Sequence, residues 1–168
     1  IYQHTSGTVP NMAILSFCDF VCGGEEAPSQ ERLLNCWPLD EFFVKCYQRP
    51  YGVGYHVLWY DWWRRPVKEN QALAVTLLFG QQLSLYGGLL YKKDAAYEKD
   101  QAPAVKIANI LKKFRPAQAQ WHPFWKKQDI LSVPAPLKAS FYLYSGEKAL
   151  VFISNLHEQD CTATIGFN

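Results

Sequence analysis

The stretch YGVGYHVLWY, residues 51–60, decides which fold the sequence predicts. Its glycines and its β-branched and aromatic residues are typical of a buried strand. A helix is expected on each side of this strand. The first covers residues 39–47, and the second covers residues 71–79, where Asn70 is a good N-cap and Gly80 is a typical residue just past a helix end. Strands that alternate with helices in this way predict a parallel sheet.

The same alternation extends in both directions from residues 51–60. Residues 1–4 alternate like a strand and lead into a long loop. Residues 83–86 predict a short strand, and residues 103–116 predict an amphipathic helix that begins and ends at a proline. We therefore expect βα units over residues 1–116.

The pattern changes to all-β near the end of the chain. Three β-type runs separated by turn residues predict an antiparallel meander, and they cover residues 139–144, 149–155 and 161–167. The predicted fold is therefore α/β followed by all-β. It has three parts: βα units (1–116), a proline-rich connector (117–136) and the start of a small antiparallel β-domain (137–168).

Length and composition restrict the class of protein. The chain has 168 residues, of which 49% are hydrophobic and 15% aromatic, which is enough for one domain or for parts of two. No apolar run is long enough to span a membrane. The net charge is −4 over residues 1–62 and +6 over residues 63–168, and the lysines fall in short pairs typical of helix ends and loops rather than of a nucleic-acid site. We predict neither a nucleic-acid partner nor a membrane span.

Cysteines and metal-binding patterns are also informative. The chain contains five cysteines, at spacings that match no zinc site, and no nucleotide-binding loop, so neither metal nor cofactor is predicted. One or two disulfides in an oxidising, extracellular or secretory compartment and buried thiols explain these residues equally well. They are Cys18, Cys22, Cys36, Cys46 and Cys161. The chain starts inside a structured segment, so we expect a fragment or a processed product.

Candidate site residues follow the predicted strands. In a barrel of βα units the chemistry lies at the carboxyl ends of the strands. Carboxylates mixed with aromatic side chains suit a sugar site, because rings stack on sugar C–H faces and acids bind hydroxyls or transfer protons. We predict Glu25 as the catalytic acid, Asp19 as its orienting partner, and a binding wall of His4, Trp59, Asp61, Trp62 and Tyr86. Such tryptophans are more often packing residues than a sugar platform, and Asp61 could equally pair with Arg64 or Arg65 at the surface.

Several stretches together resemble the C-terminal part of the large proteins related to glycoside hydrolase family 123. The similarity spans essentially the whole chain. The stretches are residues 1–6, 16–19 leading to Gly24-Glu25, 51–54, the alanine-rich helix through Asn109, 119–125 and 149–156. The resemblance implies that residues 1–116 form the last strands of a (β/α)8 TIM-type barrel. It also implies that a small antiparallel β-sandwich packs on this barrel.

The resemblance also bears on the reaction. Characterised members of the family are N-acetylgalactosaminidases that use an adjacent Asp-Glu pair and the acetamido group of the substrate. The only Asp-Glu step here is Asp40-Glu41, which begins a predicted helix and suits its dipole. Either the catalytic pair lies in preceding sequence, or this relative is not a hexosaminidase.

The sequence therefore predicts part of a glycoside hydrolase-like protein that acts on or binds carbohydrate. The remaining N-terminal part of the barrel, in the same protein or as a separate chain, is expected to complete its site. The alternative is a non-catalytic carbohydrate-binding or structural glycan-associated protein with a degenerate barrel. A third hypothesis makes residues 117–168 a protein-docking module, because exposed strand edges can pair with other chains.

Overall fold

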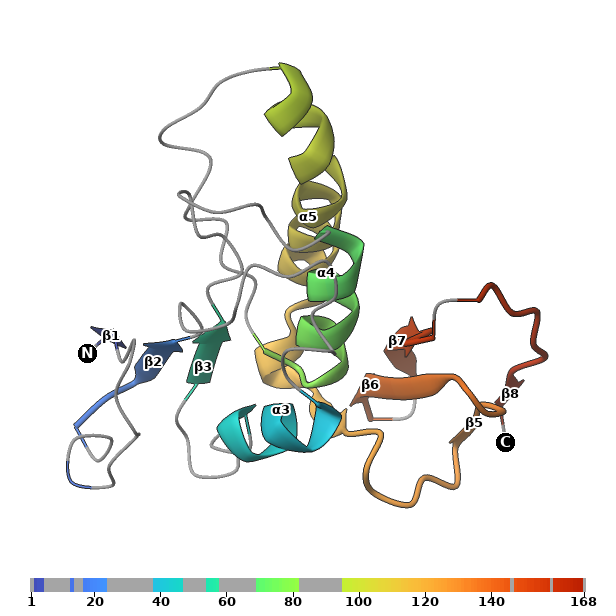
Figure 1. Ribbon diagram of the computed structural model, residues 1–168. Helices are drawn as coiled ribbons and strands as arrows, with labels where there is room; N and C mark the ends of the chain where they lie inside the picture. The colour runs from blue at the N-terminus through green and yellow to red at the C-terminus, as the bar shows by residue number, and fades with distance from the viewer. Residues whose placement is uncertain are drawn as a thin grey trace.

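The computed structural model describes residues 2–4, 13, 17–23, 38–46, 54–57, 69–81, 95–145, 147–157 and 159–167. Strands β1 to β3 and helices α3 to α5 come first, and Figure 1 places strands β5 to β8 on the other side of the helices. The bounds are β1 Tyr2–His4, β2 Phe20–Gly23, α3 Leu39–Cys46, β3 Gly54–Val57, α4 Glu69–Leu78, α5 Ala95–Phe114, the 3-10 turn η2 Pro116–Gln118, β4 Gln120–His122, β5 Leu131–Ser132, β6 Lys138–Tyr144, β7 Lys148–Ser154 and β8 Gly166–Phe167. Helices combined with small antiparallel sheets are thus confirmed.

The first sheet is parallel and has the order β1-β2-β3. Strand β3 lies inside residues 51–60, where the sequence predicts a strand. Strand β2 was not expected, because it lies in the segment interpreted as a long loop. It has only four residues, FVCG, which are too few to show a periodic pattern. The predicted strand over residues 83–86 lies outside the described residues.

Two predicted helices are confirmed, and α4 has a well-defined end. Helix α3 covers almost the whole predicted range. Helix α4 begins at Glu69, so Asn70 lies inside the first turn and is not the N-cap. Gly80 has a φ of 64°, its N–H donates to Leu77 O at 3.0 Å, and the N–H of Gln81 donates to Thr76 O at 3.0 Å. This is the Schellman arrangement, in which the left-handed residue suits glycine because it has no Cβ.

Helix α5 is longer than the sequence predicts. It covers Ala95–Phe114, so Pro103 lies in its interior and does not start it. A proline removes one helical hydrogen bond, and the helix-favouring alanine, lysine and glutamine residues around it offset that loss. Arg115, with φ 59°, ends the helix, and the hydroxyl of Tyr144 donates to the carbonyl oxygens of Phe114 and Arg115. The last carbonyls of α5 are therefore capped by strand β6.

The second sheet is antiparallel, with the order β4-β6-β7. Strands β6 and β7 agree with the predicted runs at residues 139–144 and 149–155, each shifted by one residue. Strand β4 comes from the predicted connector and pairs with β6 over three residue pairs. Residues 117–136 therefore supply structure to the sheet and do not simply join two parts.

The third predicted run, residues 161–167, is mostly not a strand. Only Gly166 and Phe167 pair, as β8, and their partner is β5 rather than β7. A Cβ on Gly166 would lie 2.7 Å from the Ser132 Oγ, so a larger residue at this position would require the Ser132 side chain to move. The expected three-strand meander is thus replaced by a three-stranded sheet and a separate two-stranded one.

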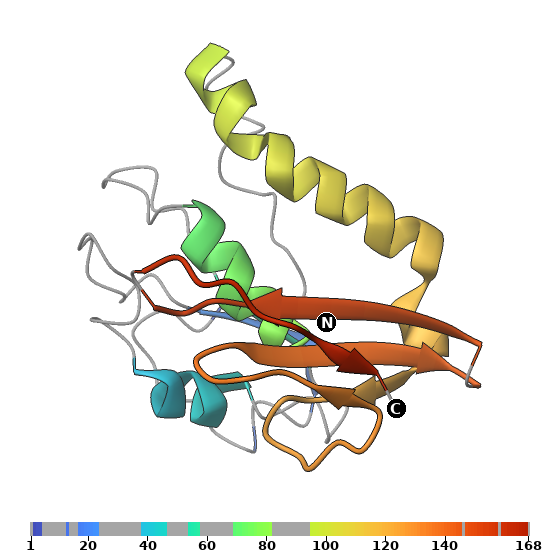
Figure 2. The same ribbon diagram turned by 90° about the vertical axis from the view of Figure 1, so that its right-hand side faces the viewer.

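The two faces of the β4-β6-β7 sheet contact different layers (Figure 2). One face packs on β5 and β8 through a cluster built on Leu131, Ala139 and Phe141. The opposite face packs on α4, where Phe152 joins a cluster of Leu73 and Leu77. Because side chains alternate along a strand, odd positions of β6 face β5 and β8, and even positions face the helix.

Candidate functional site

The carboxyl edge of the parallel sheet is where the sequence predicts a site. His4 is the last residue of β1, and β2 and β3 end at Gly23 and Val57. Parallel strands end at the same edge of a sheet, so the segments that follow these strands start next to one another. Residues from several strands can therefore contribute to one site at this edge.

The strand register adds two residues that the sequence analysis missed. His4 pairs with Cys22, and Cys22 pairs with His56. Directly paired residues of neighbouring strands lie on one face of the sheet, so these three positions form one row next to the carboxyl edge. His56 lies in the predicted strand 51–60, so its place in a strand could be expected from the sequence. Its pairing with Cys22 could be identified only once β2 was known.

Asp19 lies at the other edge of the same sheet. It precedes Phe20, the first residue of β2, which pairs with Tyr2 near the start of β1. At about 3.3 Å per residue, roughly 10 Å of strand separates Asp19 from the row that contains His4. The structure therefore does not bring these two predicted site residues together.

Asp19 is a surface residue. Its side chain is exposed.

The remaining predicted site residues lie outside the described residues. They are Glu25, Trp59, Asp61, Trp62 and Tyr86. In the sequence, Glu25 comes two residues after the last residue of β2, and Trp59 comes two residues after the last residue of β3. The Asp40-Glu41 pair lies in the first turn of α3, where the sequence analysis expects it.

Aromatic side chains gather where the helices meet the turn after β4. This aromatic cluster consists of Phe42, Phe43, Phe79, Phe124 and Trp125. Its ring centroids lie 5.1–6.0 Å apart, and Trp125 contacts both Phe43 of α3 and Phe79 at the end of α4. Such distances are those of packed aromatic pairs. In the described part of the chain, aromatic residues thus join the helices to the β structure.

His122, the last residue of β4, is a polar side chain packed against an aromatic ring. Its ring stacks on Phe141 of β6 with centroids 4.4 Å apart and planes 3° from parallel. Its Nε2 is buried, and no described residue hydrogen bonds to that atom. Burial lowers the pKa of the His122 imidazole because the charged form loses its hydration. The sequence analysis did not single out this histidine, since it lies in the predicted connector.

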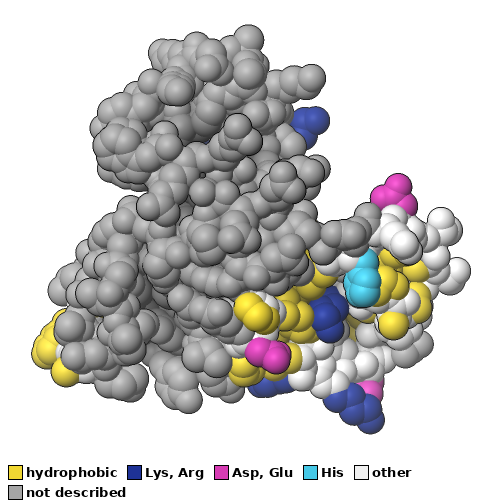
Figure 3. Space-filling view, in the orientation of Figure 1, with side chains coloured by type: hydrophobic (Ala, Val, Ile, Leu, Met, Phe, Trp, Pro, Cys, Tyr) yellow, Lys and Arg dark blue, Asp and Glu magenta, His cyan; other side chains and the backbone are white. Residues whose placement is uncertain are grey.

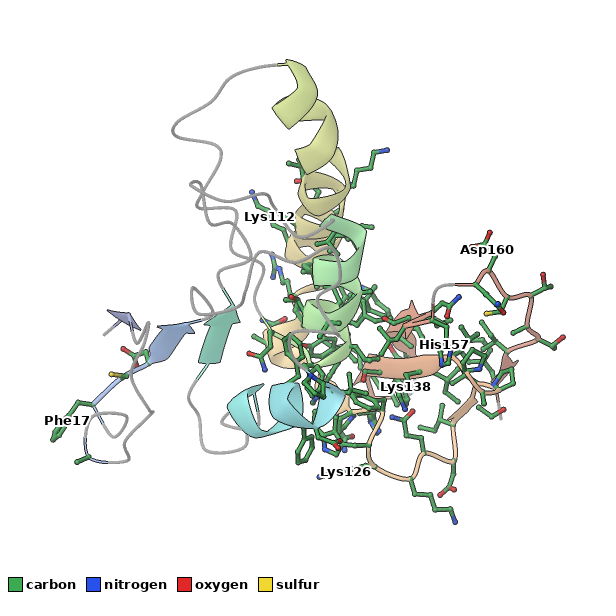
Figure 4. All side chains as sticks on the ribbon, viewed as in Figure 1. Phe17, Lys112, Lys126, Lys138, His157 and Asp160 are labelled. Atoms are coloured by element: carbon green, nitrogen blue, oxygen red, sulfur yellow. The ribbon has the colours of Figure 1, made fainter. Side chains whose placement is uncertain are left out.

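The surface around β6 carries positive charge next to apolar side chains. Figure 3 shows hydrophobic, basic and histidine side chains side by side on this face, while the acidic side chains drawn there lie apart from one another. Lys138, labelled in Figure 4, places its Nζ 5.2 Å from the centre of the Phe124 ring. The described surface around β6 is therefore a mixture of cationic and apolar side chains.

Within the described residues no cluster of three or more His, Cys, Asp or Glu side chains suits a metal ion. Cys18 and Cys161 are thiols and form no disulfide. None of the described helices is long and apolar enough to cross a membrane.

Comparisons with known proteins give no assignment. No family model, no curated protein and no solved structure matches this chain. Its function is therefore argued from its own residues and topology.

Proposed function

We propose that this chain is the C-terminal part of a glycoside hydrolase-like barrel with a small antiparallel β-sandwich domain, and that it acts on or binds carbohydrate. The observation that supports the proposal is the parallel order β1-β2-β3, with a histidine as the last residue of β1. Successive parallel strands that are neighbours in space are the repeating part of a (β/α)8 barrel. The rest of the barrel is contributed by preceding sequence or by another chain.

The strand ends also support the choice of site residues. Glu25 follows β2 and Trp59 follows β3 at the same short sequence distance, so the segments that carry them leave neighbouring strands at one edge. A carboxyl group there can protonate a glycosidic oxygen or bind a hydroxyl, and an indole ring can stack on a sugar. His4 contributes an imidazole from the adjacent strand. Asp61, Trp62 and Tyr86 extend the binding wall.

Asp19 has no role in the proposed proton transfer. It precedes β2 and so lies at the opposite edge of the sheet from the carboxyl ends of the strands. The acid in the proposal is therefore Glu25, and any second carboxylate comes from the part of the barrel that precedes this chain.

The test is a Glu25→Gln substitution in the intact protein. We expect glycoside turnover to fall by at least about a hundredfold, because general acid catalysis contributes about 10²–10⁴-fold. The matched control is Glu147→Gln, which makes the same change at an exposed turn between β6 and β7 and should leave turnover unchanged. Unchanged turnover and unchanged sugar affinity in Glu25→Gln would contradict the proposal.

A glycan array separates the enzyme from the non-catalytic alternative. Amino sugars and uronic acids are the classes to screen, with the intact protein and with the Glu25→Gln variant. An enzyme should hydrolyse a bound sugar and should retain it when Glu25 is replaced. A non-catalytic carbohydrate-binding protein should bind the same sugar with no turnover in either form.

A further inference from the structure

The segment that follows β4 makes one of several contacts between the β structure and the helices, beside the packing of β7 on α4 and the hydrogen bonds from Tyr144 to the end of α5. Directly after β4, the N–H of Phe124 donates to the Ser140 Oγ at 2.9 Å, and the Ser140 hydroxyl donates to Leu78 O at 2.7 Å. Trp125 then enters the aromatic cluster that includes residues of α3 and α4. We call Phe124, Trp125 and these contacts the joint. Its position depends on β4, an edge strand with only three residue pairs.

His122 is the last residue of β4 and lies two residues before the joint. One face of its ring stacks on Phe141, and its backbone carbonyl oxygen accepts a hydrogen bond from the Gln128 side chain at 3.2 Å. The neutral ring suits this place. When the imidazole is protonated, its ring carries a positive charge and both ring nitrogens are hydrogen-bond donors. The buried Nε2 then has no acceptor among the described residues, so the charged form is disfavoured.

No opposite charge described in the structure compensates a protonated His122. Strands β5 and β8, which pack on the same face of the sheet, contain no titratable residue, and Lys138, Tyr142, Tyr144 and Lys148 occupy positions of β6 and β7 that face the helices. Charged or titratable groups in the neighbouring segments are all exposed: Lys126, Lys127, Asp129, His157, Asp160 and Cys161. Asp129 lies 3.8 Å from Lys127, and both side chains are more than four-fifths exposed.

We propose that His122 makes the joint between the β structure and helices α3 and α4 sensitive to acid. Protonation of its ring favours a state in which β4 separates from β6. The Phe124 N–H then loses the Ser140 hydroxyl, and Trp125 leaves the aromatic cluster. Strands β6 and β7, which pair over seven residues, stay together.

The direction of the effect follows from the two states of the histidine. In the closed state the pKa of His122 lies below its ordinary value, and in the open state it returns to about 6.5. The open state therefore binds the proton more tightly. The closed joint is favoured above the ordinary pKa and loses stability as the pH falls toward the lowered one, by up to about tenfold per pH unit.

The experiment is amide hydrogen exchange followed residue by residue, with rates corrected for the intrinsic effect of pH. Between about pH 7 and about pH 5 we expect the Phe124 amide to lose protection by several-fold or more, while amides at the centre of the β6–β7 pair keep theirs. His122→Phe keeps a ring on Phe141 and cannot be protonated, so its Phe124 amide should stay protected at both pH values. His122→Gln is the second variant, in case the larger ring disturbs the fold.

A matched control uses the exposed histidine of the same region. His157→Phe removes a titratable imidazole outside the β4–β6 pair and should retain the acid response. The proposal is overturned if the acid response persists unchanged in the His122 variants, or if Phe124 and the β6–β7 amides lose protection together. It is supported if only the His122 substitutions abolish the loss at Phe124.

Discussion

Ser140 ties three segments together through one hydroxyl group. It is fully buried at the start of β6, accepts from the Phe124 N–H and donates to the Leu78 carbonyl near the end of α4. The two groups that it satisfies are backbone groups whose regular partners are missing, because one lies in a turn and the other at a helix end. A serine among apolar strand residues carries no sequence signal for a contact 62 residues away. This residue could be interpreted only from the structure.

Replacing Ser140 with alanine should therefore be costly. Each buried backbone group left without a partner costs about 1–3 kcal/mol, so we expect Ser140→Ala to lower the free energy of unfolding by about 2–4 kcal/mol. Urea denaturation monitored by circular dichroism measures the change. Ser154→Ala removes one similar bond, to Ala74 O at 2.8 Å, and should cost about half as much. A loss for Ser140→Ala no larger than that for Ser154→Ala would show that the hydroxyl serves only one of its two partners.

At the scale of elements, predictions succeeded where the pattern was long or the end signal specific. Helix α3, strands β6 and β7, and the glycine after α4 were all predicted. Strands β2, β4 and β5 were missed because two to four residues cannot show a period, and they form only by pairing with distant segments. Helix α5 extends past its proline because the helix-favouring residues around that proline outweigh one lost hydrogen bond.

The end of α4 allows a direct test of its glycine. Gly80 has a left-handed φ of 64°, which costs an ordinary L-residue about 1–2 kcal/mol. Gly80→Ala should therefore lower the free energy of unfolding by about 1 kcal/mol or more. Gly80→Asn should cost less, because asparagine tolerates this conformation best after glycine. Equal losses for the two variants, measured by thermal and urea unfolding, would mean that space around residue 80, and not its backbone angle, sets the cost.

At the scale of the whole molecule, the candidate site was only partly accessible from sequence. The rule that chemistry follows strand ends singled out His4 and Glu25, but it also grouped Asp19 with them because β2 was not recognised. Because β2 covers Phe20–Gly23, Asp19 directly precedes this strand, and Glu25 comes after it in the sequence. The order and direction of the strands determine at which edge of the sheet each residue lies. Residue types alone do not reveal that order.

The aromatic cluster should make residues before and after position 116 unfold as one unit. Trp125 of the segment after β4 lies 5.2 Å from Phe43 of α3, ring centre to ring centre. In a double-mutant cycle of Phe43→Ala and Trp125→Ala we expect a coupling energy of about 0.5–1.5 kcal/mol, the usual value for an aromatic pair. The control cycle combines Phe43→Ala with Val151→Ala, which changes a residue of the opposite sheet face and should be additive within about 0.5 kcal/mol. Two separate unfolding transitions, or no coupling between Phe43 and Trp125, would mean that α3 and the β structure fold independently.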